Sequence, residues 1–197
     1  MLRIDTLRVG AQPPISFEVA PGACVGVEGP SGSGKTRLLR AIADLDEAEG
    51  YVYLDGEERG EMPAPAWRRR VRYVSAEPAW WADTPRAHMP RAARLDGMAA
   101  ALGLDPDILD RPVAHLSTGE RQRLGLMRAL ADEPVALLLD EPTSALDAAA
   151  AATVEGLIQV ALRAGRIVVL VSHDQGLIER LAGQRIALAA PAAERAA

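Results

Sequence analysis

Cysteines, aromatic residues and long apolar runs are all scarce in this chain of 197 residues. Cys24 is the only cysteine, so the chain forms no internal disulfide. Its place in an apolar run predicts a small core residue rather than a reactive thiol. Aromatic residues make up 4% of the chain, whereas alanine is abundant, which predicts helices packed closely on a sheet. Because no apolar run reaches about 18 residues, we expect no membrane-spanning helix.

The start of the chain and its charge exclude further classes of protein. No apolar stretch of signal-peptide length follows Met1, so we expect a cytoplasmic protein. The formal net charge of −5 argues against a general affinity for nucleic acid. Hydrophobic residues nevertheless make up 49% of the chain, enough for a sizeable core. The length predicts a single domain over residues 1–197.

The most informative motif is a glycine-rich loop between an apolar run, residues 23–27, and a helical pattern, residues 38–43. Its spacing fits G-x-x-x-x-G-K-[ST], a loop whose backbone N–H groups surround the phosphates of a nucleoside triphosphate. The N-terminus of the following helix adds partial positive charge. We expect Lys35 to reach the β- and γ-phosphates and the Thr36 hydroxyl to bind Mg²⁺. The predicted nucleotide-binding residues here are Gly29, Pro30, Ser31, Gly32, Ser33, Gly34, Lys35, Thr36 and the adjoining Arg37.

The order of the expected elements predicts an α/β fold with a doubly wound, mostly parallel sheet and short N-terminal strands. Between residues 78 and 115 five prolines separate short helical pieces, which indicates a small helical subdomain inserted at about 78–132. We expect strands within 1–28 and at 51–54, 70–75, 135–139, 167–171 and 185–189, helices at about 91–102, 118–132 and 148–164, one more starting at Asp105-Pro106, and a frayed tail at 190–197.

A buried strand that ends in two carboxylates predicts catalytic chemistry. Residues 137–139 are all leucine, and Asp140 and Glu141 follow them. Such a strand delivers Asp140 to the edge of the sheet beside the phosphate loop, where it would hold Mg²⁺ through water. Glu141 would orient and deprotonate the attacking water. Taken alone, the pattern also fits a strand followed by an acidic turn, and the phosphate loop favours the catalytic interpretation.

Residues 116–123, with the sequence LSTGERQR, begin a predicted helix. Ser117 with Glu120 three residues later fits a capping box, which by itself indicates a well-capped helix and nothing more. The alternative is a second anion site at this helix N-terminus, formed by Ser117 and the backbone N–H groups of Thr118 and Gly119.

Together these motifs resemble those of the ATP-binding cassette (ABC) ATPases. Residues 116–120 are similar to the family signature L-S-G-G-Q, with Thr118 and Glu120 as variants. The chain also carries a D-loop, residues 144–147, and a switch histidine, His173. The resemblance covers nearly the whole chain, because all of these motifs occur in the family's order.

The resemblance implies the cofactors, the pairing of chains and the mechanism. ATP and Mg²⁺ are the expected cofactors, and two chains would pair head to tail as a homodimer. Each ATP would lie between the phosphate loop of one chain and the signature of the other, with Ser117 and Gly119 at the γ-phosphate. The signature and seam residues expected to contact this ATP are Ser117, Thr118, Gly119, Glu120 and Asp147. The expected catalytic residues are Glu141, His173 and Lys35.

The function implied by the resemblance is that of an ABC transporter ATPase subunit that drives a separate membrane permease from the cytoplasmic face of the membrane. Residues 143–147 are weakly similar to small bacterial metal or iron exporter cassettes, and haem exporters are the next candidate. One alternative is a non-transport ABC ATPase that acts on ribosomes or DNA, although this chain carries neither a second cassette nor a long coiled-coil insertion. Another is a degenerate nucleotide-sensing module.

Two positions depart from the family pattern and motivate that last alternative. Ala76 stands where the family has a glutamine that contacts Mg²⁺ or the water, and Glu77 is only a partial substitute, one residue out of register. Residues 1–14 contain no Phe, Tyr, Trp or His to stack on adenine, which leaves Arg8 or Val9 to cover the base.

Other features lie outside these motifs. The basic run at 67–72 predicts a solvated face or internal ion pairs, with contact to anionic lipid headgroups as the alternative. Trp80 and Trp81 are the expected docking point for the permease, since Trp often carries binding energy at interfaces; the alternative is that both pack internally. His88 and His115 match no motif and are expected to be structural or exposed.

Overall fold

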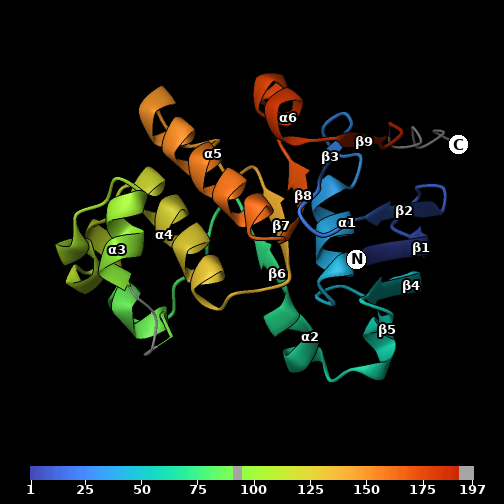
Figure 1. The fold of residues 1–197 in the computed structure, drawn as a ribbon, viewed down its shortest axis with the longest axis horizontal. Helices are drawn as coiled ribbons and strands as arrows, with labels where there is room; N and C mark the ends of the chain where they lie inside the picture. Colours follow the sequence, from blue (N-terminus) through green and yellow to red (C-terminus); the bar gives the residue numbers. More distant parts are fainter. Residues whose placement is uncertain (91–94, 191–197) are drawn as a thin grey trace, which may run out of the picture.

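The computed structural model describes residues 1–90 and 95–190. Its strands form two sheets, one parallel and one antiparallel (Figure 1). The strands are β1 (Leu2–Arg8), β2 (Ile15–Val19), β3 (Cys24–Glu28), β4 (Glu49–Leu54), β5 (Glu57–Glu58), β6 (Val71–Val74), β7 (Ala136–Asp140), β8 (Ile167–Val171) and β9 (Gln184–Ala187).

The helices include both α-helices and short 3₁₀ turns. The α-helices are α1 (Lys35–Ile42), α2 (Ala64–Arg70), α3 (Leu95–Ala101), α4 (Thr118–Ala131), α5 (Ala148–Arg163) and α6 (Gln175–Leu181). The 3₁₀ helices are η1 (Arg59–Glu61), η2 (Pro85–His88), η3 (Pro106–Asp110) and η4 (Val113–His115). Over the described residues, no helix is both long enough and apolar enough to cross a membrane.

The parallel sheet has the strand order β6-β7-β8-β3-β9, and the antiparallel sheet has the order β2-β1-β4-β5. Strands adjacent in the parallel sheet are far apart in the sequence, because helices connect them. Figure 1 shows α3 and α4 at one end of the molecule and the antiparallel sheet at the other, with the parallel sheet between them. The expected α/β fold with a mostly parallel sheet is therefore confirmed.

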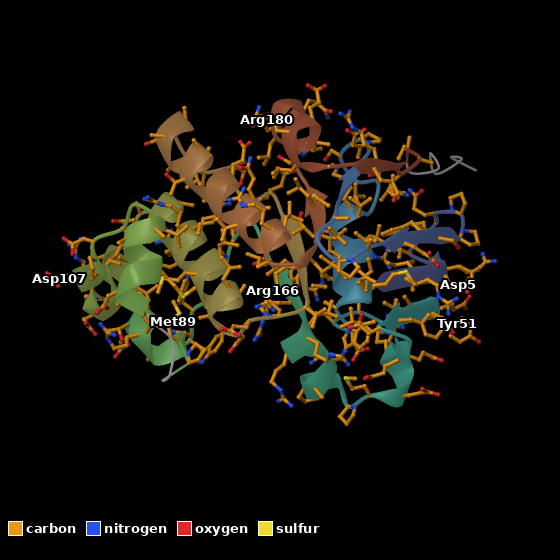
Figure 2. The ribbon with its side chains drawn as sticks, in the orientation of Figure 1. Asp5, Tyr51, Met89, Asp107, Arg166 and Arg180 are labelled. Atoms are coloured by element: carbon orange, nitrogen blue, oxygen red, sulfur yellow. The ribbon has the colours of Figure 1, made fainter. Side chains whose placement is uncertain are left out.

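Two hydrophobic cores lie on opposite faces of the parallel sheet. All residues of β7 and β8 are buried, as expected for strands covered on both faces. Leu138 and Val169 face the core that contains α1 and the antiparallel sheet. Leu137 and Val168 face the core that contains α3 to α6. Figure 2 shows Arg180 on α6, whose Nε donates to Glu155 of α5 at 2.9 Å and links these two helices.

Most expected elements occur where the sequence places them, and the helical region differs in detail. The segment that starts at Asp105-Pro106 is a 3₁₀ helix, capped by the Asp105 carboxylate, which accepts from the backbone N–H of Asp107 at 3.0 Å. Of the expected helix at 91–102, residues 95–101 are helical and residues 91–94 lie outside the described part. Of the expected frayed tail, residues 191–197 lie outside it too. A separate subdomain at about 78–132 stays a prediction.

The basic run at 67–72 forms internal contacts, as expected. The Trp67 indole is buried and donates to the Ile42 carbonyl at 2.9 Å. Arg70 pairs with Glu57 at 2.6 Å, and Arg72 pairs with Asp132 of the segment after α4. Cys24 is buried in the core, as predicted, and burial raises the pKa of its thiol to about 12, so the thiol is not reactive.

Candidate nucleotide-binding and catalytic site

The glycine-rich loop joins β3 to α1 through three glycines with positive φ, a conformation that other residues rarely adopt; Gly32, for example, has φ 77°. Gly29 has φ 151° and Gly34 has φ 94°. A Cβ on Gly29 would lie 2.7 Å from Ser33 Oγ and 2.9 Å from the Leu188 carbonyl oxygen. Gly34 is also the N-cap of α1, so the loop delivers its backbone N–H groups to the start of a helix.

Lys35 and Ser33 are the buried polar side chains of this loop. Lys35 Nζ donates to the carbonyl oxygens of Gly29 at 2.8 Å and Pro30 at 3.1 Å, which holds the ammonium group against the loop. Ser33 Oγ is buried and has no hydrogen-bond partner among the residues that the structure describes. A buried hydroxyl without a partner and an ammonium group on one loop are donors that phosphate oxygens can satisfy.

Asp140 ends β7 beside the loop and collects two hydroxyl donors. Its Oδ2 accepts from Thr36 Oγ1 at 2.8 Å and from the Tyr73 hydroxyl at 3.0 Å, and Asp140 is 5% exposed. Burial and the Asp140 charge raise the pKa of the Tyr73 phenol, so Tyr73 stays a neutral donor. Thr36 and Asp140 thus form a hydroxyl–carboxylate pair, the oxygen donor set that suits Mg²⁺.

Glu141 directly follows Asp140. One of its carboxylate oxygens accepts a hydrogen bond and the other does not. Glu141 Oε2 accepts from the backbone N–H of His173 at 3.1 Å. Glu141 Oε1 is buried and accepts no hydrogen bond within the described part of the chain, although His173 Nε2 lies 3.4 Å from it. The His173 side chain is 71% exposed. This arrangement leaves Oε1 able to accept a proton from a nearby water.

One cavity of about 330 Å³ brings the predicted residues of loop and sheet edge together. Its lining comes from the phosphate loop, the first turn of α1, the ends of β7 and β8, and the residues that follow these two strands. Its lining residues are Ser31, Gly32, Gly34, Lys35, Thr36, Arg37, Asp140, Glu141, Val171 and His173.

The signature residues occupy a different place. Among the described residues, none from 117 to 120 lines this cavity. The capping box is present: Ser117 Oγ accepts from the Glu120 N–H at 3.2 Å, and Glu120 Oε2 accepts from the Ser117 N–H at 2.7 Å. The Ser117 N–H and the Ser117 hydroxyl both donate to Glu120 Oε2, and these two bonds lower the pKa of Glu120. A Cβ on Gly119 would lie 3.1 Å from the Ala145 carbonyl oxygen, so the signature packs closely on the D-loop.

Asp147 is the N-cap of α5. Its carboxylate accepts from the Ala150 N–H at 2.8 Å, and the residue is exposed. The D-loop therefore leads into a capped helix, and the contact that we predict between Asp147 and ATP is not made within one chain's cavity.

The region expected to cover the base requires a correction. Val9 is 6% exposed and packs in the core with the antiparallel sheet, so its side chain cannot cover a base. Arg8 is exposed and lies 3.7 Å from Glu49. Arg37 lies over the loop after β1, where a Cβ on Gly10 would meet its guanidinium nitrogen at 2.9 Å.

Sequence reasoning missed two side chains that bind the catalytic segments. Tyr73 has no role in the sequence motifs, yet its hydroxyl binds Asp140. Gln122 was quoted within the signature stretch without a role, yet its amide contacts the backbone of both Ala76 and Glu141. A polar residue in an otherwise apolar helix face was the available sign for Gln122.

Comparison with known proteins decides the family. A family model described as "ABC transporter" matches residues 13–144. The chain belongs to the ABC transporter family. This ABC cassette carries the phosphate loop, the signature and the carboxylate-ended strand within the matched residues.

Curated relatives of the cassette come from plants and bacteria. "Protein STAR1" of Oryza sativa subsp. japonica is 37% identical over 180 residues, which cover 85% of this chain and 52% of the relative. "Fe(3+) ions import ATP-binding protein FbpC 2" of Rhodococcus jostii is 40% identical over 173 residues, which cover 82% of this chain and 50% of the relative. "Methionine import ATP-binding protein MetN" of Xanthomonas campestris pv. campestris is 35% identical, covering 90% and 58%. The chain spans about half the length of these relatives.

Solved structures share the fold at lower identity. An ATP-binding subunit of an ABC transporter superposes with a TM-score of 0.87 at 23% identity, covering 95% of this chain and 85% of that one. A dimeric ATP-binding cassette in a post-hydrolysis state, bound to ADP and Pi, superposes with a TM-score of 0.83 at 24% identity, covering 95% and 94%.

Proposed function

We propose that this chain is the ATP-binding and ATP-hydrolysing subunit of an ABC transporter and that it energises a separate membrane permease. The observation that carries the proposal is that Glu141, Lys35 and the Thr36–Asp140 pair line one cavity, while Glu141 Oε1 accepts no hydrogen bond from the described residues. A carboxylate oxygen that accepts no hydrogen bond inside the protein is available to accept one from a bound water.

In the proposed reaction the loop holds the triphosphate through its N–H groups and Lys35. The water oxygen forms a bond to the γ-phosphorus while the bond from that phosphorus to the β,γ-bridging oxygen breaks, and Glu141 Oε1 accepts the proton that the water releases. His173 contacts the γ-phosphate from the end of β8. Thr36 and Asp140 would hold Mg²⁺, which would neutralise charge on the β- and γ-phosphates.

The second half of the site would come from another copy of the chain. Ser117 and the signature N–H groups lie at a helix N-terminus outside the cavity of their own chain. A head-to-tail homodimer would bring them to the γ-phosphate held by the partner's Lys35, with Asp147 along the seam. One of the solved cassettes of the same fold is described as dimeric and bound to ADP and Pi.

The permease is proposed to dock near Trp81. This side chain is 76% exposed, whereas Trp80 packs on the core of α3 and α4, so the alternative that both pack internally is wrong. A cavity of about 270 Å³ lies beside Trp81, between β6, the loop at 75–88 and α4. His88 Nε2 accepts from the N–H groups of Trp81 at 2.9 Å and Ala82 at 3.1 Å, which fixes this loop.

Trp81→Ala tests this docking surface. The variant is expected to fold and to hydrolyse ATP normally but to lose co-purification with the permease. Trp80→Ala is the comparison, because it removes core packing and should lower the melting temperature. Normal co-purification of a folded Trp81→Ala chain would place the docking surface elsewhere.

The direction of transport that we propose is import. The bacterial relatives FbpC and MetN are named for import of Fe(3+) ions and of methionine. The export direction expected from residues 143–147 therefore has no support among these relatives, and we replace it. We further propose that the chain acts at the cytoplasmic face of the membrane, bound to its permease rather than to nucleic acid.

The deciding experiment is phosphate release from MgATP, measured for the chain alone and with a co-expressed candidate permease. The proposal expects hydrolysis that the permease changes. Hydrolysis stimulated by ribosomes or DNA instead would favour the non-transport ATPase. ATP binding with no hydrolysis under either condition would favour the degenerate sensor.

A further inference from the structure

Gln122 is a buried polar side chain that the proposed reaction does not yet use. It lies in the second turn of α4, after the signature, and is 2% exposed. Both ends of its amide are occupied by groups from other segments. Nε2 donates to the Glu141 carbonyl at 2.7 Å, to Ser144 Oγ at 3.2 Å and to the Ala76 carbonyl at 3.3 Å. Oε1 accepts from the Ala145 N–H at 3.2 Å.

The shortest of these bonds reaches a strained residue. Glu141 has φ 51°, the left-handed region that residues other than glycine rarely adopt. Such a conformation persists only when surrounding contacts hold it. Its carbonyl accepts from Gln122 Nε2 and also from Ser144 Oγ at 3.1 Å, while its N–H donates to the Val171 carbonyl at 2.9 Å.

The backbone conformation of Glu141 decides where its carboxylate lies. Because the carboxylate follows the strained backbone, a change in φ would swing Oε1 away from the cavity and from His173. Gln122 also ties this residue to the D-loop and to the Ala76 loop, the segment that precedes the proposed docking surface. One amide therefore joins the signature helix to two loops, the one that contains Ala76 and the one at 141–147 that runs from Glu141 through the D-loop.

We propose that Gln122 is a positioning residue that holds Glu141 in its left-handed conformation and so places the carboxylate for attack by water. This inference rests on the proposed ATPase activity. Gln122 touches neither the cavity nor, by this account, the nucleotide, so it acts on the rate of hydrolysis and not on ATP binding.

The test is Gln122→Met in the full chain, since Met has nearly the same length and volume but cannot replace the amide's hydrogen bonds. We expect kcat to fall by about ten- to a hundredfold, because small displacements of a catalytic group have effects of that order. The KM for ATP should change by less than about threefold by the same argument. The matched control is Gln159→Met on α5, whose amide makes one long bond of 3.4 Å to Glu155, and it should leave kcat and KM unchanged.

A second variant keeps the test decisive if Gln122→Met does not fold. Ser144→Ala removes the exposed hydroxyl that donates to the Glu141 carbonyl and accepts from Gln122. It should lower kcat less than Gln122→Met, again at unchanged KM. In the double variant the two losses should be less than multiplicative, because both act through the same carbonyl.

The outcomes separate this inference from the proposed function. If the wild-type chain hydrolyses ATP and a folded Gln122→Met chain has the same kcat, the positioning role alone is overturned. If Gln122→Met unfolds, an unchanged kcat in Ser144→Ala overturns it instead. A rise in KM equal to the loss in kcat/KM also overturns it, since that would mean a role in binding. No phosphate release from MgATP by the wild-type chain, alone or with its permease, overturns the proposed function itself.

Discussion

The two ends of the candidate nucleotide site differ in how completely they are built. At the phosphate end, α1, β7 and β8 bring Lys35, Asp140 and Glu141 to one cavity. At the end where a base would lie, Val9 is buried in the core and Arg8 faces solvent beside Glu49. This difference indicates that triphosphate recognition and base recognition are separable. In this chain most of the residues expected to bind the nucleotide would contact the triphosphate.

Aromatic residues are present near the base end but are used elsewhere. Figure 2 shows Tyr51 and Asp5 on the antiparallel sheet, where they are cross-strand partners on its two central strands, β4 and β1. The Tyr51 and Tyr53 rings stack with centroids 6.3 Å apart, and Arg3 lies over the Tyr53 ring. Neither ring lines the phosphate cavity among the described residues. They stabilise the sheet surface.

The largest effect that would sharpen this comparison is expected from Glu141→Gln. The amide cannot accept the proton from water, so hydrolysis should fall by about a hundredfold or more, which is the usual contribution of a general base. ATP affinity should be retained, and ATP-bound dimers should accumulate. Phosphate release and light scattering measure both effects. Turnover equal to that of the wild type would remove Glu141 from the catalytic role.

Lys35→Ala tests the phosphate end of the site through the affinity of the chain for ATP. A charge-assisted contact is worth about 1.5–3 kcal/mol, so ATP should bind about ten- to a hundredfold more weakly. Calorimetry at constant salt is the measurement. Arg163→Ala is a suitable control. Arg163 lies at the far end of α5, and its substitution removes a positive charge, as Lys35→Ala does. Equal affinity of the Lys35→Ala chain and the wild type would break the phosphate-loop assignment.

Because no aromatic platform covers the base, we expect the chain to discriminate poorly between ATP and GTP. Base stacking is worth about 1–3 kcal/mol where an aromatic platform exists, and this chain lacks one in residues 1–14. Competition binding should give affinities for ATP and GTP within about tenfold, that is about 1.4 kcal/mol. A much larger preference for ATP would show that a residue outside this segment, such as Arg37, contacts the base.

Ala76→Gln is expected to have the smallest effect, a rise of a fewfold in basal turnover. By the family pattern, an amide at this position would orient the attacking water or bind Mg²⁺. Basal phosphate release of the two chains, measured side by side, tests this. No change would mean that Glu77 or a permease group already serves that purpose.

Sequence alone predicted the parts of the molecule that local patterns determine. The glycines at 29 and 34 were predictable because their spacing serves a turn with positive φ, and the capping box at Ser117 and Glu120 because its hydrogen bonds join residues three apart. The buried strands at 136–140 and 167–171 were predictable because strands covered on both faces are uninterruptedly apolar.

Contacts between distant segments were not predictable from these patterns. The Tyr73 hydroxyl meets Asp140 only because β6 pairs with β7 in a register that places Tyr73 opposite Leu138. The direction of Gln122 depends on how α4 packs on two loops, and the burial of Val9 depends on the antiparallel sheet. The 3₁₀ geometry after Asp105 was missed, since the same cap and first-turn proline also begin α-helices.

The most direct test of the account is calorimetric binding of ATP and of inorganic tripolyphosphate to the wild-type chain, both with Mg²⁺. If the phosphate end carries recognition, the two ligands should bind with affinities within about tenfold, a difference of about 1.4 kcal/mol. ATP binding more than about a hundredfold tighter than tripolyphosphate would contradict the account, because the base end would then contribute as much as a stacked aromatic platform.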